Sequence, residues 1–229
     1  MYAPDVPTEN TNPYHAPGFC EGSAWQFTWY VPHDVKSLIN LIGERQFIDR
    51  LNAGFATSEK VSFNALGDNM GAYPINHGNE TNMQAAYLFS YTSEPWHTQK
   101  WARAIQEKYY GMGPRDAYPG DEDQGQMSSW YILSSIGLFQ MDGGCSKDPV
   151  WLLGSPRFDR VEILLDNTYY SGKKLIIKAE NVSKDNCYIQ YVRFNNKRLS
   201  NNYIEWSKLK KGGTLHFIMG DRPNPNAFK

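Results

Sequence analysis

Residues 120–125 read GDEDQG and place three carboxylates, Asp121, Glu122 and Asp123, side by side between two glycines. Adjacent carboxylates repel one another, so the arrangement requires a solvated turn, a bound cation or a catalytic task. In an extended loop, residues i and i+2 point to the same side, so Asp121 and Asp123 would share one side. Such a pair can activate water and bind a cation. The opposing interpretation is an acidic N-terminus for the following helix, where negative charge complements the helix dipole.

Another carboxylate, Glu21, lies just before an aromatic helix start in FCEGSAWQFTW, residues 19–29. Phe19, Trp25 and Phe27 flank it in sequence, so its side chain would be partly desolvated and could stay protonated as a general acid. The simpler interpretation is a glutamate that only complements a helix dipole. Taken alone, this stretch favours the simpler interpretation.

A third polar motif is HGNETNMQ, residues 77–84, which gathers four side-chain oxygens within six positions, those of Asn79, Glu80, Asn82 and Gln84. Carboxylate and amide oxygens are hard donors of the kind that calcium prefers, although the spacing is not that of an EF-hand. The alternative is a polar loop that caps the next helix, and the stretch alone favours that alternative.

Together the three motifs match the needs of an inverting glycosidase. Such an enzyme places an acid and a base on opposite faces of a sugar, about 6.5–9.5 Å apart, with a water between base and sugar. Aromatic residues make up 14% of the chain and can pack against sugar rings, although they fill cores more often. Trp25 and Trp96 are candidates for such stacking, whereas Trp130 lies within a predicted helix and is expected in the core.

The bulk numbers limit the functional classes. The 229 residues carry a net charge of −1 with no basic stripe, which argues against nucleic-acid binding. No apolar run reaches transmembrane length. The three cysteines, Cys20, Cys145 and Cys187, are far apart and lack zinc-site spacing, so they are expected as free thiols. The N-terminus lacks signal-peptide regions and reads like the middle of a longer protein.

Hydrophobic spacing predicts helices in the first part of the chain, within 37–55, 83–92, 94–110 and 126–139. Gly43 should break the first into two, Asn82 should cap the second, Pro95 suits the first turn of the third, and the glycines at 143–144 should end the fourth. After Pro149 the pattern becomes strand-like, within 150–156, 160–165, 174–181, 188–195 and 214–219. The sequence therefore predicts a helical region, residues 1–148, and a β region, residues 149–229.

Four stretches, in this order, resemble one known family: CEGSAWQFTWYVPHD, HGNETNMQAAYLFSYTSEPWHTQ, PGDEDQGQMSSWYILSSIGLFQMDGG and WLLGSPRFDRVEI. They resemble the C-terminal part of the catalytic region of glycoside hydrolase family 92, the exo-acting α-mannosidases of bacteria such as gut Bacteroides. The resemblance implies a mainly α fold, a partial (α/α)6 barrel with about half of its helices, followed by a small β-sheet or sandwich segment. It also implies an N-terminal β-sandwich domain outside this chain. A half-barrel would expose apolar helix faces and self-associate.

The resemblance further implies calcium-dependent, inverting hydrolysis of terminal α-mannosides of N-glycans or mannans, often with α-1,2 linkages. Glu21 then corresponds to the general acid, and Asp121 or Asp123 to the base that activates water. The calcium ligands implied are Asn79, Glu80, Gln84 and Asp123. Substrate contacts are expected from Trp25, Trp96 and Glu80. A periplasmic or secreted location also follows from the family.

The chain departs from the family pattern at Thr81, where members often have proline, and at Met83 and Gln84, where histidine is frequent. This loop shapes both the metal site and the leaving-group side, so the linkage stays open. One alternative is a catalytically silent sugar-binding fragment that lacks the N-terminal half of the site. Another is a different (α/α)6 enzyme, such as a disaccharide phosphorylase, although no residue here selects phosphate.

Overall fold

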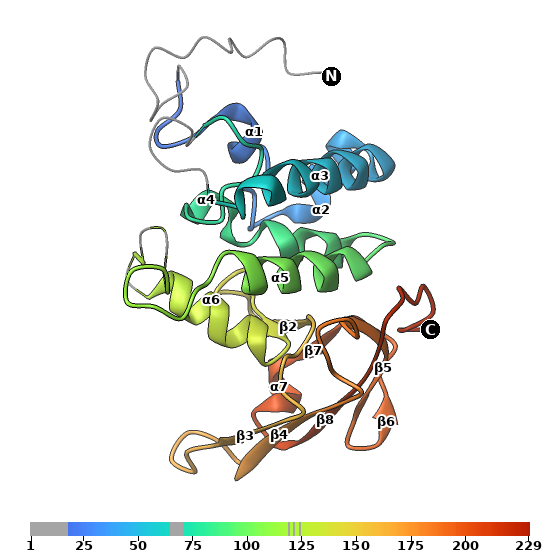
Figure 1. The fold of residues 1–229 in the computed structure, drawn as a ribbon. Coiled ribbons are helices and arrows are strands. Elements are labelled where there is room, and N and C mark those ends of the chain that lie inside the picture. Colours follow the sequence, from blue (N-terminus) through green and yellow to red (C-terminus); the bar gives the residue numbers. More distant parts are fainter. Residues whose placement is uncertain (1–17, 65–70, 119, 121, 124) are drawn as a thin grey trace. The chain divides into compact units, whose positions relative to one another are not determined.

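The computed structural model describes residues 18–64, 71–118, 120, 122–123 and 125–229. It is a mixed fold of helices and two sheets, with the helices concentrated in the first part of the chain (Figure 1). Two compact units divide it: Met1–Thr92 with Ala104–Trp130, and Ser93–Arg103 with Tyr131–Lys229. The (α/α)6 arrangement and the predicted boundary at residue 148 stay predictions. Among the described residues, every helix is too short or too polar to span a lipid bilayer.

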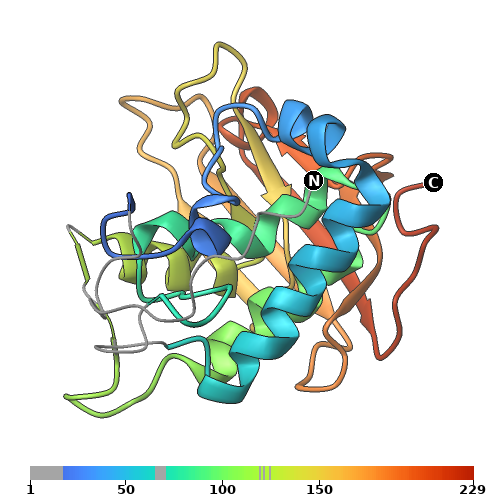
Figure 2. The same cartoon turned by 90° about the horizontal axis from the view of Figure 1, so that it is seen from above.

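The first unit is helical, and its described elements are α1 (Ala24–Phe27), α2 (Val35–Ile42), α3 (Glu44–Ser58), η1 (Glu59–Val61), α4 (Glu80–Met83), η3 (Ala85–Tyr91), the end of α5 (Trp96–Lys108) and the start of α6 (Gln126–Ser135). Gly43 separates α2 from α3 with a φ of +87°, which confirms the predicted break. The two helices pack against each other (Figure 2). Phe55 of α3 contacts the rings of Phe63 and Phe89, each with centroids 6.1 Å away, so α3 anchors this core.

Two predicted helix boundaries are wrong. Asn82 does not cap a helix but lies inside α4, where its buried amide accepts from Asn76 N and donates to Gln26 O, each at 2.9 Å. Satisfying the backbone of two other segments outweighs a local cap. The last of the predicted helices, α6, ends at Ser135 and not near 143–144, because Gly137 at φ +81° turns the chain into a strand.

The second unit holds two sheets, one of three strands in the order β1-β2-β7 and one of five in the order β3-β4-β8-β5-β6. The strands are β1 (Leu138–Phe139), β2 (Val150–Leu153), β3 (Arg160–Leu164), β4 (Lys174–Glu180), β5 (Tyr188–Phe194), β6 (Lys197–Arg198), β7 (Tyr203–Glu205) and β8 (Gly213–Gly220), with a short helix α7 (Trp206–Leu209). Each of the five strand-like runs of the sequence overlaps one of these strands.

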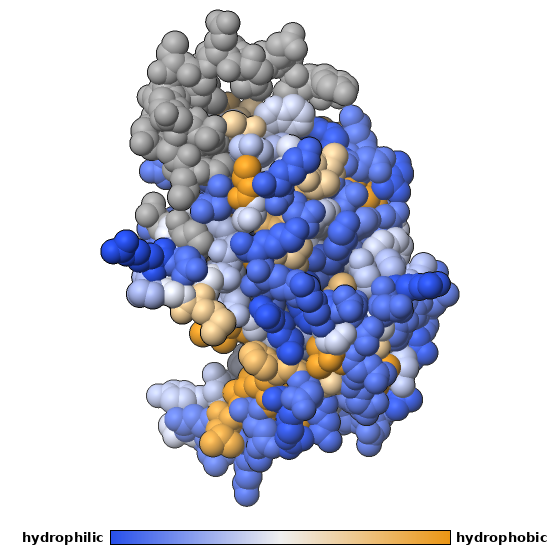
Figure 3. Space-filling model, in the orientation of Figure 1, coloured by the Kyte–Doolittle hydropathy of each residue, from blue (hydrophilic) through white to orange (hydrophobic). Residues whose placement is uncertain are grey.

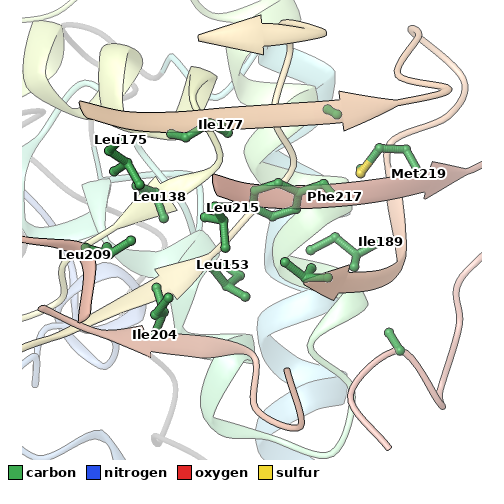
Figure 4. Close-up of a cluster of buried hydrophobic side chains, with 13 residues drawn as sticks. Leu138, Leu153, Leu175, Ile177, Ile189, Ile204, Leu209, Leu215, Phe217 and Met219 are labelled. Atoms are coloured by element: carbon green, nitrogen blue, oxygen red, sulfur yellow. The ribbon is translucent and has the colours of Figure 1, made fainter. Parts of the chain in front are cut away.

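Both sheets of the second unit share one core, in which Leu138, Leu153 and Ile204 of the smaller sheet meet Ile177 and Phe217 of the larger (Figure 4). Alternate residues of β8 are buried, which is the period expected of a half-buried strand. Apolar surface remains visible near β3 (Figure 3), where Leu164 is 77% exposed. All three cysteines are free thiols, as predicted.

A buried histidine, His77, lies at the centre of a cluster of aromatic rings in the first unit. His77 is fully buried, with its ring centroid 4.3 Å from that of Trp130 and 4.9 Å from that of Tyr109. Its Nε2 pairs with Tyr110 Oη at 2.8 Å, and that hydroxyl donates to Met127 O at 3.3 Å. Burial lowers the pKa of His77 to about 3, so the imidazole is neutral at pH 7. Trp130 is core, as expected.

This buried imidazole should make the chain sensitive to acid. The unfolded histidine takes up a proton below pH 6.5, whereas the folded one does so only near pH 3, so stability is lost as the pH falls from 6.5 towards 3. At pH 5 the loss is about 2 kcal/mol. We expect His77→Gln to remove this part of the pH dependence, measured by urea unfolding at pH 7 and pH 5.

The matched control is His33→Gln, which replaces an exposed histidine and should leave the wild-type pH dependence in place. The same loss of stability in wild type and His77→Gln would show that His77 does not carry the acid sensitivity.

Candidate active site

The turn that carries Glu21 is fastened to the loop that carries Glu80. Asn79 stands at the N-cap position of α4, yet its side chain does not cap that helix. Its Nδ2 instead donates to the carbonyl oxygen of Glu21 at 2.5 Å, across 58 residues of sequence. Two of the three predicted motifs are therefore brought together, with Glu80 half-buried in the first turn of α4.

The third motif, GDEDQG, contacts the HGNE loop where Gly120 meets Gly78. A β-carbon added to Gly120 would lie 2.7 Å from Gly78 Cα and 2.8 Å from Gly78 O, which no real side chain tolerates. The same added carbon would lie 2.6 Å from Tyr109 Oη, and one added to Gly78 would lie 2.8 Å from that hydroxyl. The backbone of GDEDQG therefore packs directly on the backbone of HGNE, with Tyr109 closing the contact.

Within the acidic run, the three carboxylates do not share one role. Glu122 accepts from Ser128 N at 3.2 Å and from Ser128 Oγ at 2.5 Å, so it caps the start of α6. The dipole interpretation of the acidic run thus applies to Glu122. Asp123 is exposed at the turn before α6, and its side chain takes no part in the capping hydrogen bonds that Glu122 makes with Ser128. Asp121 lies outside the described residues.

Glu21 and Asp123 share a backbone feature that ordinary surface carboxylates lack. Their φ angles are +51° and +40°, in the left-handed region that non-glycine residues rarely adopt. Such a conformation costs about 1–3 kcal/mol and persists only where neighbours impose it, as the Asn79 bond does for Glu21. Strain of this kind is concentrated at functional sites, so the positive φ angles of Glu21 and Asp123 both suggest a functional site on the loops that carry them.

The amides of the HGNETNMQ loop differ in how well they suit a cation at this place. Asn79 Nδ2 donates to Glu21 O, which leaves the side-chain oxygen of Asn79 as a possible metal ligand. Gln84 Nε2 is held by Trp29 O at 3.2 Å and Thr81 O at 3.0 Å.

Asn79 and Gln84 are thus tied to opposite ends of α1, which follows Glu21 and precedes Trp29. An oxygen-only set from Asn79, Glu80 and Asp123 fits the donor preference of calcium, and Gln84 is the least well placed of the predicted ligands. Among the described residues, no group of three histidine, cysteine, aspartate or glutamate side chains stands in metal-binding geometry.

The predicted aromatic contacts are distributed over both units. Trp25 is 40% exposed, and the guanidinium carbon of Arg50 lies 5.7 Å from its ring centroid, so the indole is held by a cation–π contact while part of it faces solvent. Trp96 is half-buried and belongs to the second unit. Glu21 is exposed, so its aromatic neighbours do not bury it in this chain.

Sequence reasoning overlooked the residues that hold the site together, namely Gly78, Gly120, Tyr109 and His77. The glycines flank the chemical motifs in HGNE and PGDED, and a glycine beside a polar motif is a signal for close backbone approach. Which backbone each glycine would meet is a tertiary fact that the motif does not contain.

Comparison with known proteins gives concordant results. The sequence matches the glycosyl hydrolase family 92 catalytic domain over residues 4–221. An uncharacterized secreted glycosidase of Arthroderma benhamiae is 29% identical over 203 residues, which are 87% of this chain and 23% of that protein.

Two solved structures from Bacteroides thetaiotaomicron are similar. The family GH92 α-mannosidase BT3965, in complex with mannoimidazole, has 32% identity and a TM-score of 0.79 over 98% of this chain and 30% of its own. The GH92 inverting mannosidase BT2199 has 32% identity and a TM-score of 0.75 over 89% of this chain and 28% of its own. The chain thus spans 23% to 30% of the length of these relatives. With the family match extending over nearly the whole sequence, the chain belongs to glycosyl hydrolase family 92.

Proposed function

We propose that the protein containing this chain is an exo-acting α-mannosidase that hydrolyses terminal α-mannosides of N-glycans or mannans, of the α-1,2 type, with calcium and with inversion. The observation that carries the proposal is the meeting of the Glu21 turn, the Asn79–Glu80 loop and the Gly120–Asp123 loop. These loops carry the candidate acid, oxygen ligands and base, so the contacts between their backbones support the proposal. Membership of the family and the likeness to two mannosidases support the same chemistry.

In this mechanism Glu21 donates its proton to the glycosidic oxygen as the bond from that oxygen to C1 breaks. Asp121 or Asp123 accepts a proton from water, whose oxygen bonds to C1 from the opposite face, so the anomeric configuration inverts. Glu122 is already committed to Ser128, which leaves the base role to the two aspartates.

For the cation, Asn79, Glu80 and Asp123 are the residues that would hold calcium, and Gln84 is kept as a weaker candidate. Bound calcium would hold two neighbouring mannose hydroxyls and favour a distorted ring. Glu80, half-buried in the first turn of α4, is also the proposed contact for a substrate hydroxyl. Trp25, oriented by Arg50, would pack against a sugar face. Trp96, which belongs to the second unit, stays a predicted substrate contact.

The partners and location follow the same reasoning. Mannose-containing glycans are the substrates proposed, and a periplasmic or secreted location is supported by the secreted relative. Self-association, or pairing with an N-terminal β-sandwich domain, remains a prediction that the size-exclusion mass of the chain tests. A catalytically silent sugar-binding chain is the competing proposal, supported by the departures at Thr81 and Met83.

The central test is mannose release from α-linked mannobioses by the wild-type chain and by Glu21→Gln. Loss of the acid should lower the rate about a hundred- to ten-thousandfold, because general acid catalysis contributes that factor. Glu44→Gln is the matched control, since Glu44 is an exposed glutamate in the first turn of α3 and should retain the wild-type rate.

Equal rates for wild type and Glu21→Gln would remove Glu21 from the mechanism. Binding of mannobiose without any release of mannose by the wild-type chain would instead favour the silent sugar-binding protein.

Calcium dependence gives a separate prediction. Chelation with EDTA should abolish mannose release, and added Ca²⁺ should restore it better than Mg²⁺, which prefers a stricter octahedral geometry. Glu80→Gln should raise the Ca²⁺ concentration for half-maximal release by more than about tenfold, since even supporting residues of metal sites contribute that much. Unchanged release in EDTA would contradict the calcium assignment.

A further inference from the structure

Basic side chains form a row across the five-stranded sheet of the second unit, whose strands are labelled in Figure 1. Residues that pair directly across two strands lie side by side on the same face of a sheet. The successive pairs are Arg160 with Lys178, Lys178 with His216, His216 with Arg193, and Arg193 with Arg198. We call these five residues the cationic row. Alternate residues of the same strands point into the core of the unit, so the row lies on the opposite face.

The register at one end of the row is fixed by a tight turn. Asn195 and Asn196 have φ angles of +48° and +66°, as in the type I′ turn of a two-residue hairpin. This turn places Arg198 of β6 opposite Arg193 of β5. The linear sequence shows no basic stripe, because the five residues come from five different strands and only the sheet brings them into line.

The cationic row is unfavourable for the sheet itself, because like charges directly opposite one another on neighbouring strands are destabilising. Four of its members are arginine or lysine, all exposed, and the fifth, His216, is half-buried. With Lys174 of β4, the strand residues of this face carry five permanent cations against two carboxylates, in a chain with a net charge of −1. Positive charge that is concentrated at a cost in stability suggests an anionic ligand.

The two carboxylates of this face, Glu162 and Glu180, compensate only part of the row. Glu162 pairs with Arg160, and also with Lys174 at 2.6 Å. Glu180 Oε1 lies 2.9 Å from Nε2 of His216. Three members of the row take part in no ion pair among the described residues, namely Lys178, Arg193 and Arg198.

The geometry of the row suits a linear polymer better than a charged surface. Neighbouring strands lie about 4.8 Å apart, so the row is about 19 Å long. Glu162 lies two residues to one side of it and Glu180 two residues to the other. An anionic membrane or a DNA duplex laid on this face would bring its own negative charges against these carboxylates, which is unfavourable. A single extended chain can follow the row between them.

Among linear polyanions, a glycan fits this face better than a single-stranded nucleic acid. Such nucleic acids bind through bases that stack on open aromatic rings. The ring beside the row is that of Tyr191, and the guanidinium carbons of Arg193 and Arg198 lie 5.0 and 5.4 Å from its centroid. The ring is thus already engaged by two cations.

The spacing of the cations also selects the kind of glycan. An extended polysaccharide advances by about one strand spacing per sugar residue, so one carboxylate per sugar can meet one cation per strand. Arginine contributes three members of the row, and its planar guanidinium binds a carboxylate through two parallel hydrogen bonds.

We propose that the cationic row binds an acidic polysaccharide with one carboxylate per sugar residue, a polyuronate, along the outer face of the five-stranded sheet. The row belongs to the second unit, whereas Glu21, Glu80 and Asp123 belong to the first. The assignment does not depend on mannose release, because it takes its ligand from the charge and spacing of the sheet alone.

The test is an NMR titration of the isotope-labelled full chain with a hexamer of mannuronic acid, at low salt and without calcium, which would itself bind the carboxylates. The hexamer should shift the amide signals of Lys178, His216 and Arg193. Its affinity should fall steeply as NaCl is added, because salt screens exposed charges. Neutral mannohexaose, which has the same length, should leave these signals unchanged.

Two pairs of substitutions in the row separate charge from structure. Lys178→Gln with Arg193→Gln should lower the affinity for the hexamer about tenfold, as the removal of two exposed charge pairs allows. Their unfolding temperature should not fall, since like charges are removed from the sheet. Lys178→Arg with Arg193→Lys keeps both charges and should retain most of the affinity.

The matched control is Lys36→Gln with Lys60→Gln, which removes two exposed cations of the first unit and should preserve the affinity. The proposal is overturned by equal losses in the control and in the row variant, by equal binding of mannohexaose, or by the absence of shifts at low salt. Tighter binding of hexathymidylate, or of vesicles that contain phosphatidylglycerol, would assign the row to a nucleic acid or a membrane instead.

Discussion

The candidate site depends on one steric constraint, the direct contact between the backbones of Gly78 and Gly120. An added β-carbon at Gly120 would lie closer to Gly78 than any real side chain allows, so only glycine permits this approach. The contact is what joins the acidic loop to the oxygen-rich loop. The proposed calcium site needs Asp123 near Glu80, and this backbone contact is the observation that brings their two loops together. Among the described residues, no ion pair or metal-binding cluster of acidic and histidine side chains links these loops.

An aromatic cluster of His77, Tyr110 and Trp130 adjoins Gly78 in the sequence through His77. Tyr110 stacks on Trp130 with an interplanar angle of 11°, and His77 packs edge-on against both. Close packing of this kind resists deformation, and it fixes His77, which directly precedes Gly78 and lies two residues before Asn79, the partner of the left-handed Glu21. The stability of the first unit thus supports the conformations that its chemistry requires.

Local rules in the sequence were enough for most elements of the fold. Gly43 divides two helices because its backbone adopts a positive φ, and the alternating pattern of residues 214–219 marks a half-buried strand. The failures were long-range. Asn82 and Asn79 both look like caps, but their amides bond to partners 56 and 58 residues away. No helix-capping rule can foresee a carbonyl that tertiary folding brings to the amide.

The same limit applies to the site. The spacing predicted that Asp121 and Asp123 share one side of the loop, and the cap that Glu122 makes on Ser128 fits the opposing interpretation, an acidic start to the following helix. Local patterns made Glu21 and Asp123 candidates but did not favour chemistry over a role at a helix start, and it was the resemblance to the family that assigned them catalytic roles. The left-handed turn at Ser62 and Phe63, which sends Phe63 into the core, had no signal in the sequence, since neither residue type favours a positive φ.

One consequence concerns how an exposed acid could work. Glu21 is accessible in the free chain, and Trp25 beside it is held by Arg50 with part of its ring open. In the proposed mechanism, a mannose ring packed on Trp25, four residues after Glu21 in the chain, would help to exclude water from the Glu21 carboxyl, so substrate would supply the desolvation that a buried acid obtains from protein. Because the Asn79 bond fixes the Glu21 backbone before any ligand arrives, that desolvation would not have to be accompanied by ordering of the turn. The rigid backbone and the exposed side chain are thus complementary parts of one arrangement.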